Sequence, residues 1–208
     1  MNIQQVFENN EKWVQEKLSD SPAYFENLAK GQKPPILYIG CSDSRVTAEE
    51  LMGLGPGEVF VQRNIANMVP QLDMSITSVI NYAVDHLLVD HLVVCGHYYC
   101  GGVKAAMGSD NLGILNPWLK GIRDVYRLHQ IELDKITDED ARYKRLVELN
   151  VQEQCINAMK LPDVQKAKAS RGLQVHGWVF DIGTGKLIDL KIDFESEVNK
   201  IESIYSID

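Results

Sequence analysis

The stretch Ile36-Leu37-Tyr38-Ile39-Gly40-Cys41-Ser42-Asp43-Ser44-Arg45 has a counterpart in Leu92-Val93-Val94-Cys95-Gly96-His97-Tyr98-Tyr99-Cys100-Gly101-Gly102. In each, an apolar run typical of a buried strand ends at a glycine, and polar or sulfur-bearing side chains follow at once. Residues 75–88, between the two, have apolar residues at the three-four spacing of a helix packed on a sheet. Strand, helix and strand at these lengths predict a βαβ unit with parallel strands.

Outward from this unit, the chain predicts one α/β domain over residues 1–208, with helices flanking a mostly parallel central sheet of about four to five strands. Residues 1–34 form a helical arm, because apolar residues recur at helical spacing over residues 9–29. The arm precedes the first strand, so it packs either outside the sheet or on another subunit. The other expected elements are a strand at 59–61, helices at 117–133 and 138–160, and a hairpin made of 173–180 and 187–192.

Four side chains with metal-binding chemistry follow the two apolar runs. Parallel strands would bring Cys41, Asp43, His97 and Cys100 to one carboxyl edge of the sheet, which is where open α/β sheets bind their ligands. Two thiolates and an imidazole are donors that Zn²⁺ prefers, and their charges balance the ion. A fourth position left to water would make the site catalytic rather than structural. Cys95 and Cys155 are instead expected to fill the core.

Asp43 has two possible roles at such a site. As a fourth ligand it would close the site and leave no place for water. Arg45, two residues further on, can instead take the Asp43 carboxylate in a bidentate pair and hold it away from the metal. An ordinary surface ion pair is the simpler alternative, but the place of the pair beside the metal loop favours the functional role.

Composition excludes several classes of function. The chain has 208 residues and a net charge of −8, so no basic surface is expected to bind nucleic acid or an anionic membrane. No apolar run is long enough to span a bilayer, and the N-terminus has no signal-peptide pattern. A chain of this kind with four cysteines is expected in a reducing compartment, and we predict a cytoplasmic location.

The combination of Cys41-Ser42-Asp43-Ser44-Arg45 with His97-x-x-Cys100-Gly101-Gly102 resembles the β-class carbonic anhydrases. The resemblance extends to residues 63–67, 78–84 and 172–178, and it covers most of the chain from about Gln32 to Leu187. It implies that Cys41, His97 and Cys100 are zinc ligands. It also implies that Asp43 and Arg45 form a catalytic dyad, in which the aspartate orients a hydroxide on the metal.

The activity implied by this resemblance is the reversible hydration of carbon dioxide to bicarbonate and a proton. The family also implies a homodimer or homotetramer, in which the arm wraps the neighbouring subunit and Gln32 is lent to the partner's substrate pocket. Val46 and Ile65 are candidates for the apolar wall that CO₂ requires, and plain core packing is an equal alternative for both. We place Gly101 in the substrate site as well.

Some members of this family have a second, noncatalytic bicarbonate site built from Trp, Arg and Tyr. The matching positions here are Tyr38, Arg63 and Phe180, so the arginine is kept while the indole is replaced and the phenol is missing. The sequence therefore does not favour this second site.

Two alternative functions stay open at this point. The same ligands could serve a hydrolase of COS or CS₂, as in some relatives of the family. A protein from another class, a noncatalytic zinc-stabilised or redox-sensing protein, would have Asp43 permanently bound to the metal. Arg45 argues against the latter, because a structural site needs no residue that holds its fourth ligand away.

Overall fold

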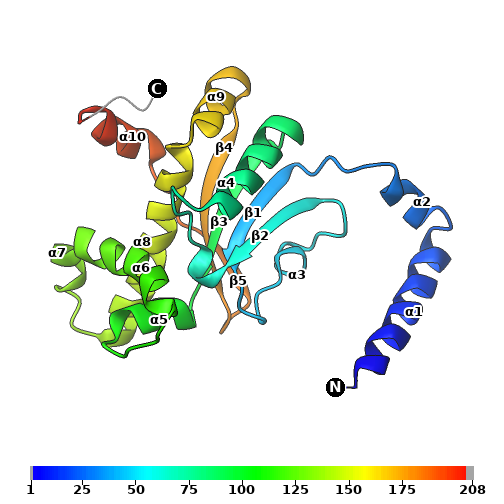
Figure 1. The fold of residues 1–208 in the computed structure, drawn as a ribbon, viewed down its shortest axis with the longest axis horizontal. Coiled ribbons are helices and arrows are strands. Elements are labelled where there is room, and N and C mark those ends of the chain that lie inside the picture. The colour runs from blue at the N-terminus through cyan, green and yellow to red at the C-terminus, as the bar shows by residue number, and fades with distance from the viewer. Residues whose placement is uncertain (1, 205–208) are drawn as a thin grey trace. The chain divides into compact units, whose positions relative to one another are not determined.

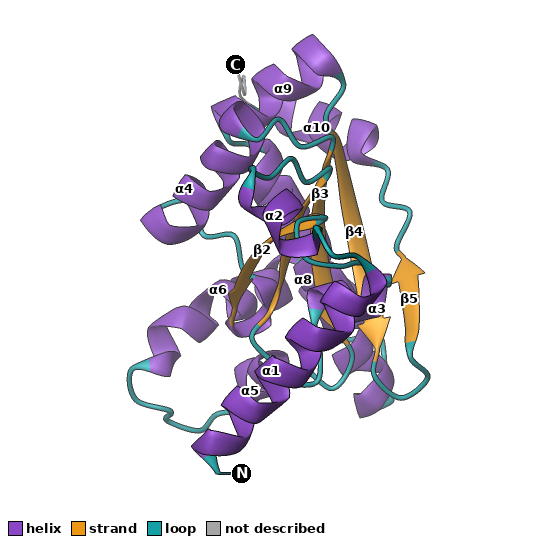
Figure 2. Cartoon of the chain, turned by 90° about the vertical axis from the view of Figure 1, so that its right-hand side faces the viewer, coloured by secondary structure: helices purple, strands orange, loops and turns teal. Residues whose placement is uncertain are grey.

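Five strands in residues 2–204, the part of the chain that this computed structural model describes, form one sheet in the order β2-β1-β3-β4-β5 (Figure 1). They are β1 Ile36–Cys41, β2 Val59–Asn64, β3 His91–His97, β4 Gln174–Asp181 and β5 Lys186–Asp189. β1 pairs in parallel with β2 and β3, β3 pairs in parallel with β4, and β5 runs antiparallel at the edge beside β4 (Figure 2). The predicted mostly parallel sheet of four to five strands with a final hairpin is confirmed.

The register of the two central strands brings their carboxyl ends together. Gly40 on β1 lies opposite Cys95 on β3 and opposite Arg63 on β2. β1 and β3 therefore both end within a few residues of the paired positions Gly40 and Cys95. Cys41 and His97, the last residues of β1 and β3, reach the same edge of the sheet.

Helices fill the connections, and their bounds differ in places from the sequence prediction. The predicted helix at 138–160 corresponds to α8 Glu139–Met159, whereas the one predicted at 117–133 breaks at His129 into α6 Leu115–Leu128 and α7 Gln130–Leu133. The predicted elements also omit α9 Pro162–Arg171, although Pro162 stands at its start and Gly172 has the left-handed conformation at its end. The helices after β1 are α3 Ala48–Met52, α4 Met74–Asn81, α5 Gly101–Met107, α6 Leu115–Leu128, α7 Gln130–Leu133, α8 Glu139–Met159, α9 Pro162–Arg171 and α10 Phe194–Glu202.

The helix predicted over residues 75–88 changes its hydrogen-bonding pattern halfway. α4 ends at Asn81 and continues as a π-helical turn, η2 Tyr82–His86. Wider π turns leave carbonyl groups without the usual helical donor. The Arg171 guanidinium, from the end of α9, donates to the carbonyl oxygens of Val84 and Val89 at 2.9 and 2.6 Å. A long-range contact thus supplies the donors, which local periodicity does not reveal.

The two faces of the sheet carry apolar clusters of very different size. Alternate residues of β1 and β3 point to opposite faces, as the pleat requires. Leu37 and Leu92 belong to the large cluster on the face where α8 packs, and Tyr38 and Val93 belong to the small cluster beside α3. α8 packs tightly on β3 at Gly96, where a Cβ atom would lie 2.6 Å from the Val151 Cγ2.

The chain divides into two compact units, of which the first ends at Lys33 and the second begins at Pro34. The first contains α1 Ile3–Asp20 and α2 Tyr24–Ala29, separated by a break that includes Ser21 and Pro22. Trp13 packs edge-on against Phe25, with ring centroids 5.3 Å apart. The expectation of a single domain with an arm over residues 1–34 stays a prediction. Within the described residues, no helix has the length and apolar character needed to cross a membrane.

Candidate metal centre

Three side chains that could hold a metal ion converge at the carboxyl edge of the sheet. Cys41 ends β1, His97 ends β3, and Cys100 is the N-cap residue of α5. Their ligand atoms all lie within 4.8 Å of one another, and all three residues are buried. The two sulfur atoms are 3.9 Å apart. The predicted convergence of donors from two distant loops is therefore present in the fold.

The imidazole of His97 is oriented for a metal. Its Nδ1 lies 2.9 Å from the Tyr98 carbonyl oxygen, so Nδ1 carries the proton and donates it there. The other ring nitrogen, Nε2, is therefore an acceptor, and it is buried without a hydrogen-bond partner among the described residues. An orphaned lone pair facing two sulfurs is costly unless something occupies the space between them. A metal ion meets that requirement, and a carbonyl that fixes the other nitrogen is the usual support of a histidine ligand.

The sulfur atoms already have the electrostatics of a ligand pair. Hydrogen bonding from the Cys100 thiol lowers the pKa of the Cys41 thiol, against the opposing effect of burial. The Ala66 amide adds a hydrogen bond to the Cys41 Sγ at 3.4 Å. Without a metal, the Cys41 thiolate accepts a hydrogen bond from the Cys100 thiol. A divalent ion replaces this proton, and two thiolates with a neutral imidazole balance its charge.

The segment that follows β2 closes over the sulfur of Cys41. This short turn, η1 Ile65–Asn67, has left-handed backbone at Ala66 (φ 63°) and Asn67 (φ 48°). Such values are uncommon outside glycine. At Gly102, a Cβ atom would lie 2.7 Å from the Ile65 Cγ2, so the missing side chain lets the start of α5 approach the turn.

Asp43 lies next to the ligands but is held by Arg45. The guanidinium of Arg45 donates to both carboxylate oxygens, from Nε at 2.9 Å and from Nη2 at 2.7 Å. Its backbone amide donates to Oδ1 at 3.0 Å. These bonds hold the pKa of the Asp43 carboxyl well below its usual range. Asp43 Oδ2 is 3.9 Å from the His97 Nε2, so the carboxylate borders the space between the ligands while its lone pairs face Arg45.

A family model described as carbonic anhydrase matches residues 36–187 of this chain. Among curated proteins, a carbonic anhydrase of Emericella nidulans is 57% identical over 203 residues, which cover 97% of this chain and 89% of the relative. Among solved structures, one of two tetrameric β-carbonic anhydrases from Sordaria macrospora has a TM-score of 0.88 and 44% identity, covering 91% of this chain and 96% of that one. The chain belongs to the β-carbonic anhydrase family.

Other β-carbonic anhydrase structures match the chain over nearly its whole length. That of the fungal pathogen Aspergillus fumigatus has a TM-score of 0.90 and 41% identity, with 98% of both chains covered. A Coccomyxa β-carbonic anhydrase in complex with acetazolamide has a TM-score of 0.87 and 36% identity, with 98% of this chain and 99% of that one covered. The likeness therefore extends beyond the motif-bearing region.

Arg63 holds the backbone of the carbonic anhydrase metal loop. Its Nε donates to the carbonyl oxygen of Cys41 at 2.8 Å, and its Nη2 donates to that of Asp43 at 2.5 Å. Tyr38 has a fully buried ring, and its hydroxyl has no partner among the described residues. Phe180 is partly buried and packs against the cluster that contains Tyr38. These positions thus contribute packing and a clamp on the loop backbone. That the second bicarbonate site is not favoured stays a prediction.

The residues predicted to contact substrate differ in their surroundings. Val46 is 1% exposed, and Ile65 is 40% exposed. A Cβ atom at Gly101 would meet open space. Gln32 belongs to the first unit of the chain. The substrate roles of all four stay predictions.

Several contacts of the carbonic anhydrase site were missed by the sequence reasoning. The Tyr143 hydroxyl on α8 donates to the Cys100 carbonyl oxygen at 3.0 Å. The indole of Trp118 on α6 donates to the Ile65 carbonyl oxygen at 2.8 Å. Both helices are distant from the motifs in sequence, and neither residue stands in a spacing that signals this role. Only the fold brings them to the metal loop.

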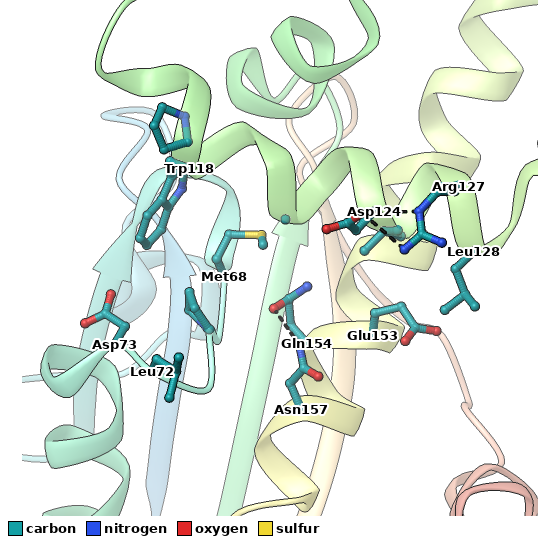
Figure 3. Close-up of a pocket in the computed structure, with 14 residues that line it drawn as sticks. Met68, Leu72, Asp73, Trp118, Asp124, Arg127, Leu128, Glu153, Gln154 and Asn157 are labelled. Atoms are coloured by element: carbon teal, nitrogen blue, oxygen red, sulfur yellow. Dashed lines mark hydrogen bonds and ion pairs between the residues drawn. The ribbon is translucent and has the colours of Figure 1, made fainter.

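A cavity of about 560 Å³ is lined by the segment from Met68 to Asp73, by α6 and by α8 (Figure 3). Met68 and Trp118 line it on one side, and Gln154 on α8 lines it on another. None of the three metal-binding residues is among its lining residues. This cavity is therefore separate from the place where the donor atoms converge.

Proposed function

We propose that this chain catalyses the reversible hydration of carbon dioxide to bicarbonate and a proton, with a zinc ion held by Cys41, His97 and Cys100. The observation that carries this proposal is that the donor atoms of these three residues converge. One of them, the His97 Nε2, is buried without a hydrogen-bond partner among the described residues. The family to which the chain belongs supports the substrate.

The donor set fits zinc better than other common metals. Sulfur and imidazole ligands favour Zn²⁺ over the oxygen-seeking Mg²⁺ and Ca²⁺, and three protein ligands leave one position open. When bound, zinc supplies a Lewis acid that lowers the pKa of a coordinated water to about 7. The charge balance of two thiolates against the ion keeps the buried site neutral, which limits the cost of burial.

Asp43 orients the attacking oxygen in this proposal. An ionised carboxylate only accepts hydrogen bonds, so it fixes the direction of an O–H group and leaves a lone pair facing the substrate carbon. Arg45 keeps the carboxylate ionised and turned away from the ligand position, through its two side-chain bonds to Asp43. Arg45 also donates to the Tyr99 carbonyl oxygen at 3.2 Å, which ties the dyad to the loop between His97 and Cys100.

Carbon dioxide has no charge and no hydrogen-bond donor, so its pocket requires apolar walls. Ile65 and Val46 provide such walls from the two loops beside the ligands, and Gly101 leaves room for the substrate. Gln32 enters the pocket of a neighbouring subunit in this proposal. The chain then works as a homodimer or homotetramer, in keeping with the tetrameric Sordaria macrospora relatives. The cytoplasmic location stays a prediction.

The decisive experiment measures zinc content and CO₂ hydration by stopped flow on the same preparations. We expect one zinc per chain and hydration activity in the wild-type protein. Cys41→Ala should lose both, and Cys95→Ala, which changes a buried thiol outside the site, should keep both. Asp43→Ala should keep zinc and lose most of its activity, because it removes the orienting group and leaves the ligands.

Two outcomes would contradict the proposal. Zinc-loaded protein without CO₂ hydration at any pH would favour a noncatalytic zinc-stabilised or redox-sensing role. Fast hydrolysis of COS or CS₂ with negligible CO₂ hydration would place the chain with the hydrolases that use the same ligands.

A further inference from the structure

One peptide group connects the sulfur of Cys41 to a helix far away in sequence. The amide N–H between Ile65 and Ala66 donates to the Cys41 Sγ at 3.4 Å. The carbonyl oxygen of the same peptide group accepts the indole N–H of Trp118 at 2.8 Å. In a trans peptide the N–H and C=O bonds point in opposite directions. The indole on one side therefore sets the direction of the amide on the other, and polarises it toward the sulfur.

The next carbonyl group is held from α8. The Asn150 side chain donates to the carbonyl oxygen of Ala66 at 3.0 Å, and Gln154 donates to the Asn150 side-chain oxygen at 3.3 Å. Gln154 in turn accepts from the Val69 amide at 2.8 Å. Figure 3 shows Gln154 on α8 facing the segment that carries Met68. The left-handed turn and the segment just after it are thus both bonded to one buried pair of amide side chains.

These buried amides have no evident role in packing. Asn150 and Gln154 are each 1% exposed, on a helix whose neighbouring buried residues are mostly apolar. A buried amide is costly unless it is hydrogen-bonded, so apolar residues would serve a purely structural contact better. Ala66 needs such partners, because its left-handed backbone, with φ 63° and ψ 35°, is unfavourable for a residue with a Cβ atom.

We infer that Trp118 and Asn150 are positioning residues that aim the Ala66 amide at the Cys41 sulfur, and thereby set how firmly that sulfur holds the metal. The inference rests on the proposed metal site and adds to it. A hydrogen bond to a thiolate withdraws electron density from the sulfur and fixes its orientation. Partners outside the ligand set commonly change metal affinity by about 10–100-fold.

The test uses Trp118→Phe in the full-length protein, with Trp178→Phe as the matched control. Trp118→Phe keeps an aromatic ring and removes the indole N–H. Trp178 packs against the small cluster on the other face of the sheet, so the control makes the same chemical change away from the turn. Each protein is loaded with zinc for chelator-driven release, and with Co²⁺ for the thiolate-to-cobalt charge-transfer band.

We expect Trp118→Phe to release zinc about tenfold faster than wild type, with the charge-transfer band moved to lower energy because the sulfur is more electron-rich. Asn150→Leu keeps a similar volume, removes the donor to Ala66, and should change the band in the same direction. The band reports on the sulfur itself, so it does not depend on activity or on small losses of stability.

Three results would overturn the inference. One is wild-type release and an unshifted band in both variants. Another is an equal shift in Trp178→Phe, which would mark a nonspecific effect. A wild-type protein without any thiolate-to-cobalt band would overturn the proposed metal site together with the inference, whereas a normal wild-type band with unchanged variants refutes the positioning role alone.

Discussion

Replacing Gly96 by alanine should separate β3 from α8 and weaken the metal site. A Cβ atom at this position would lie 2.6 Å from the Val151 Cγ2 and 3.4 Å from the Asn67 Oδ1. Carbon atoms in contact are normally about 3.5–4.0 Å apart, so the added methyl overlaps Val151 by roughly 1 Å. Val151 is fully buried, so it cannot turn away into solvent. Overpacking of this kind costs about 1–3 kcal/mol.

The matched variants are Val151→Ala and the double variant. Val151→Ala alone removes buried carbon atoms and should cost about 2 kcal/mol through lost transfer free energy and a small cavity. In the double variant the new methyl occupies the space that Val151 vacates. We therefore expect it to be no less stable than Val151→Ala, with a coupling free energy of about 1–3 kcal/mol.

The assay is guanidinium unfolding at one fixed protein concentration, because oligomer formation makes apparent stability concentration-dependent. Gly96→Ala should also lower the midpoint of thermal unfolding by roughly 2–4 °C for each kcal/mol lost. His97 follows Gly96 directly, so zinc retention should fall in the single variant and recover in the double variant. Wild-type stability in Gly96→Ala, or strictly additive losses in the double variant, would refute the reasoning.

Three further predictions concern charge and sulfur chemistry. Burial and the neighbouring His91 lower the pKa of His176 in the folded protein, so the unfolded chain binds this proton at a higher pH. The free energy of unfolding should therefore fall as the pH drops below about 6.5. His176→Gln should reduce this dependence in unfolding measured from pH 7 to 5. Burial raises the pKa of Cys95 to about 12, so iodoacetamide should leave Cys95 unmodified. Removal of the metal should direct the label to Cys41, because the pKa of its thiol is lowered. Mass spectrometry of the labelled protein identifies the modified cysteine. Arg63→Met removes the donors to the carbonyl oxygens of Cys41 and Asp43 and should lower the free energy of unfolding by about 2–3 kcal/mol. The zinc content measured by atomic absorption should fall as well. An unchanged zinc content would contradict the role of Arg63 as a clamp.

Much of the fold follows from local patterns. The apolar runs before Cys41 and His97, with a helical pattern between them, predict parallel strands, and the structure has them. At residues 75–88 the prediction differed, and a contact from elsewhere in the chain accompanies the difference. The helix over residues 75–88 ends in a π turn, and the Arg171 guanidinium from α9 donates to the carbonyl oxygens of Val84 and Val89 there. The missed α9 is a different case, since Pro162 and Gly172 already mark its ends in the sequence.

Side-chain identity and strand polarity, both read from the sequence, predicted which atoms could hold a metal ion. The ability of an atom to bind a metal depends on the type of side chain, which the sequence gives directly. Parallel strands in one sheet have their carboxyl ends at the same edge, so the loops that follow them lie close together. Only the tertiary structure decided what surrounds those atoms: the left-handed Ala66 amide on Cys41, the clamp by Arg63, and the helices that supply Trp118 and Asn150. These contacts join residues 20 to 84 positions apart, and packing, rather than any spacing in the sequence, brings such residues together.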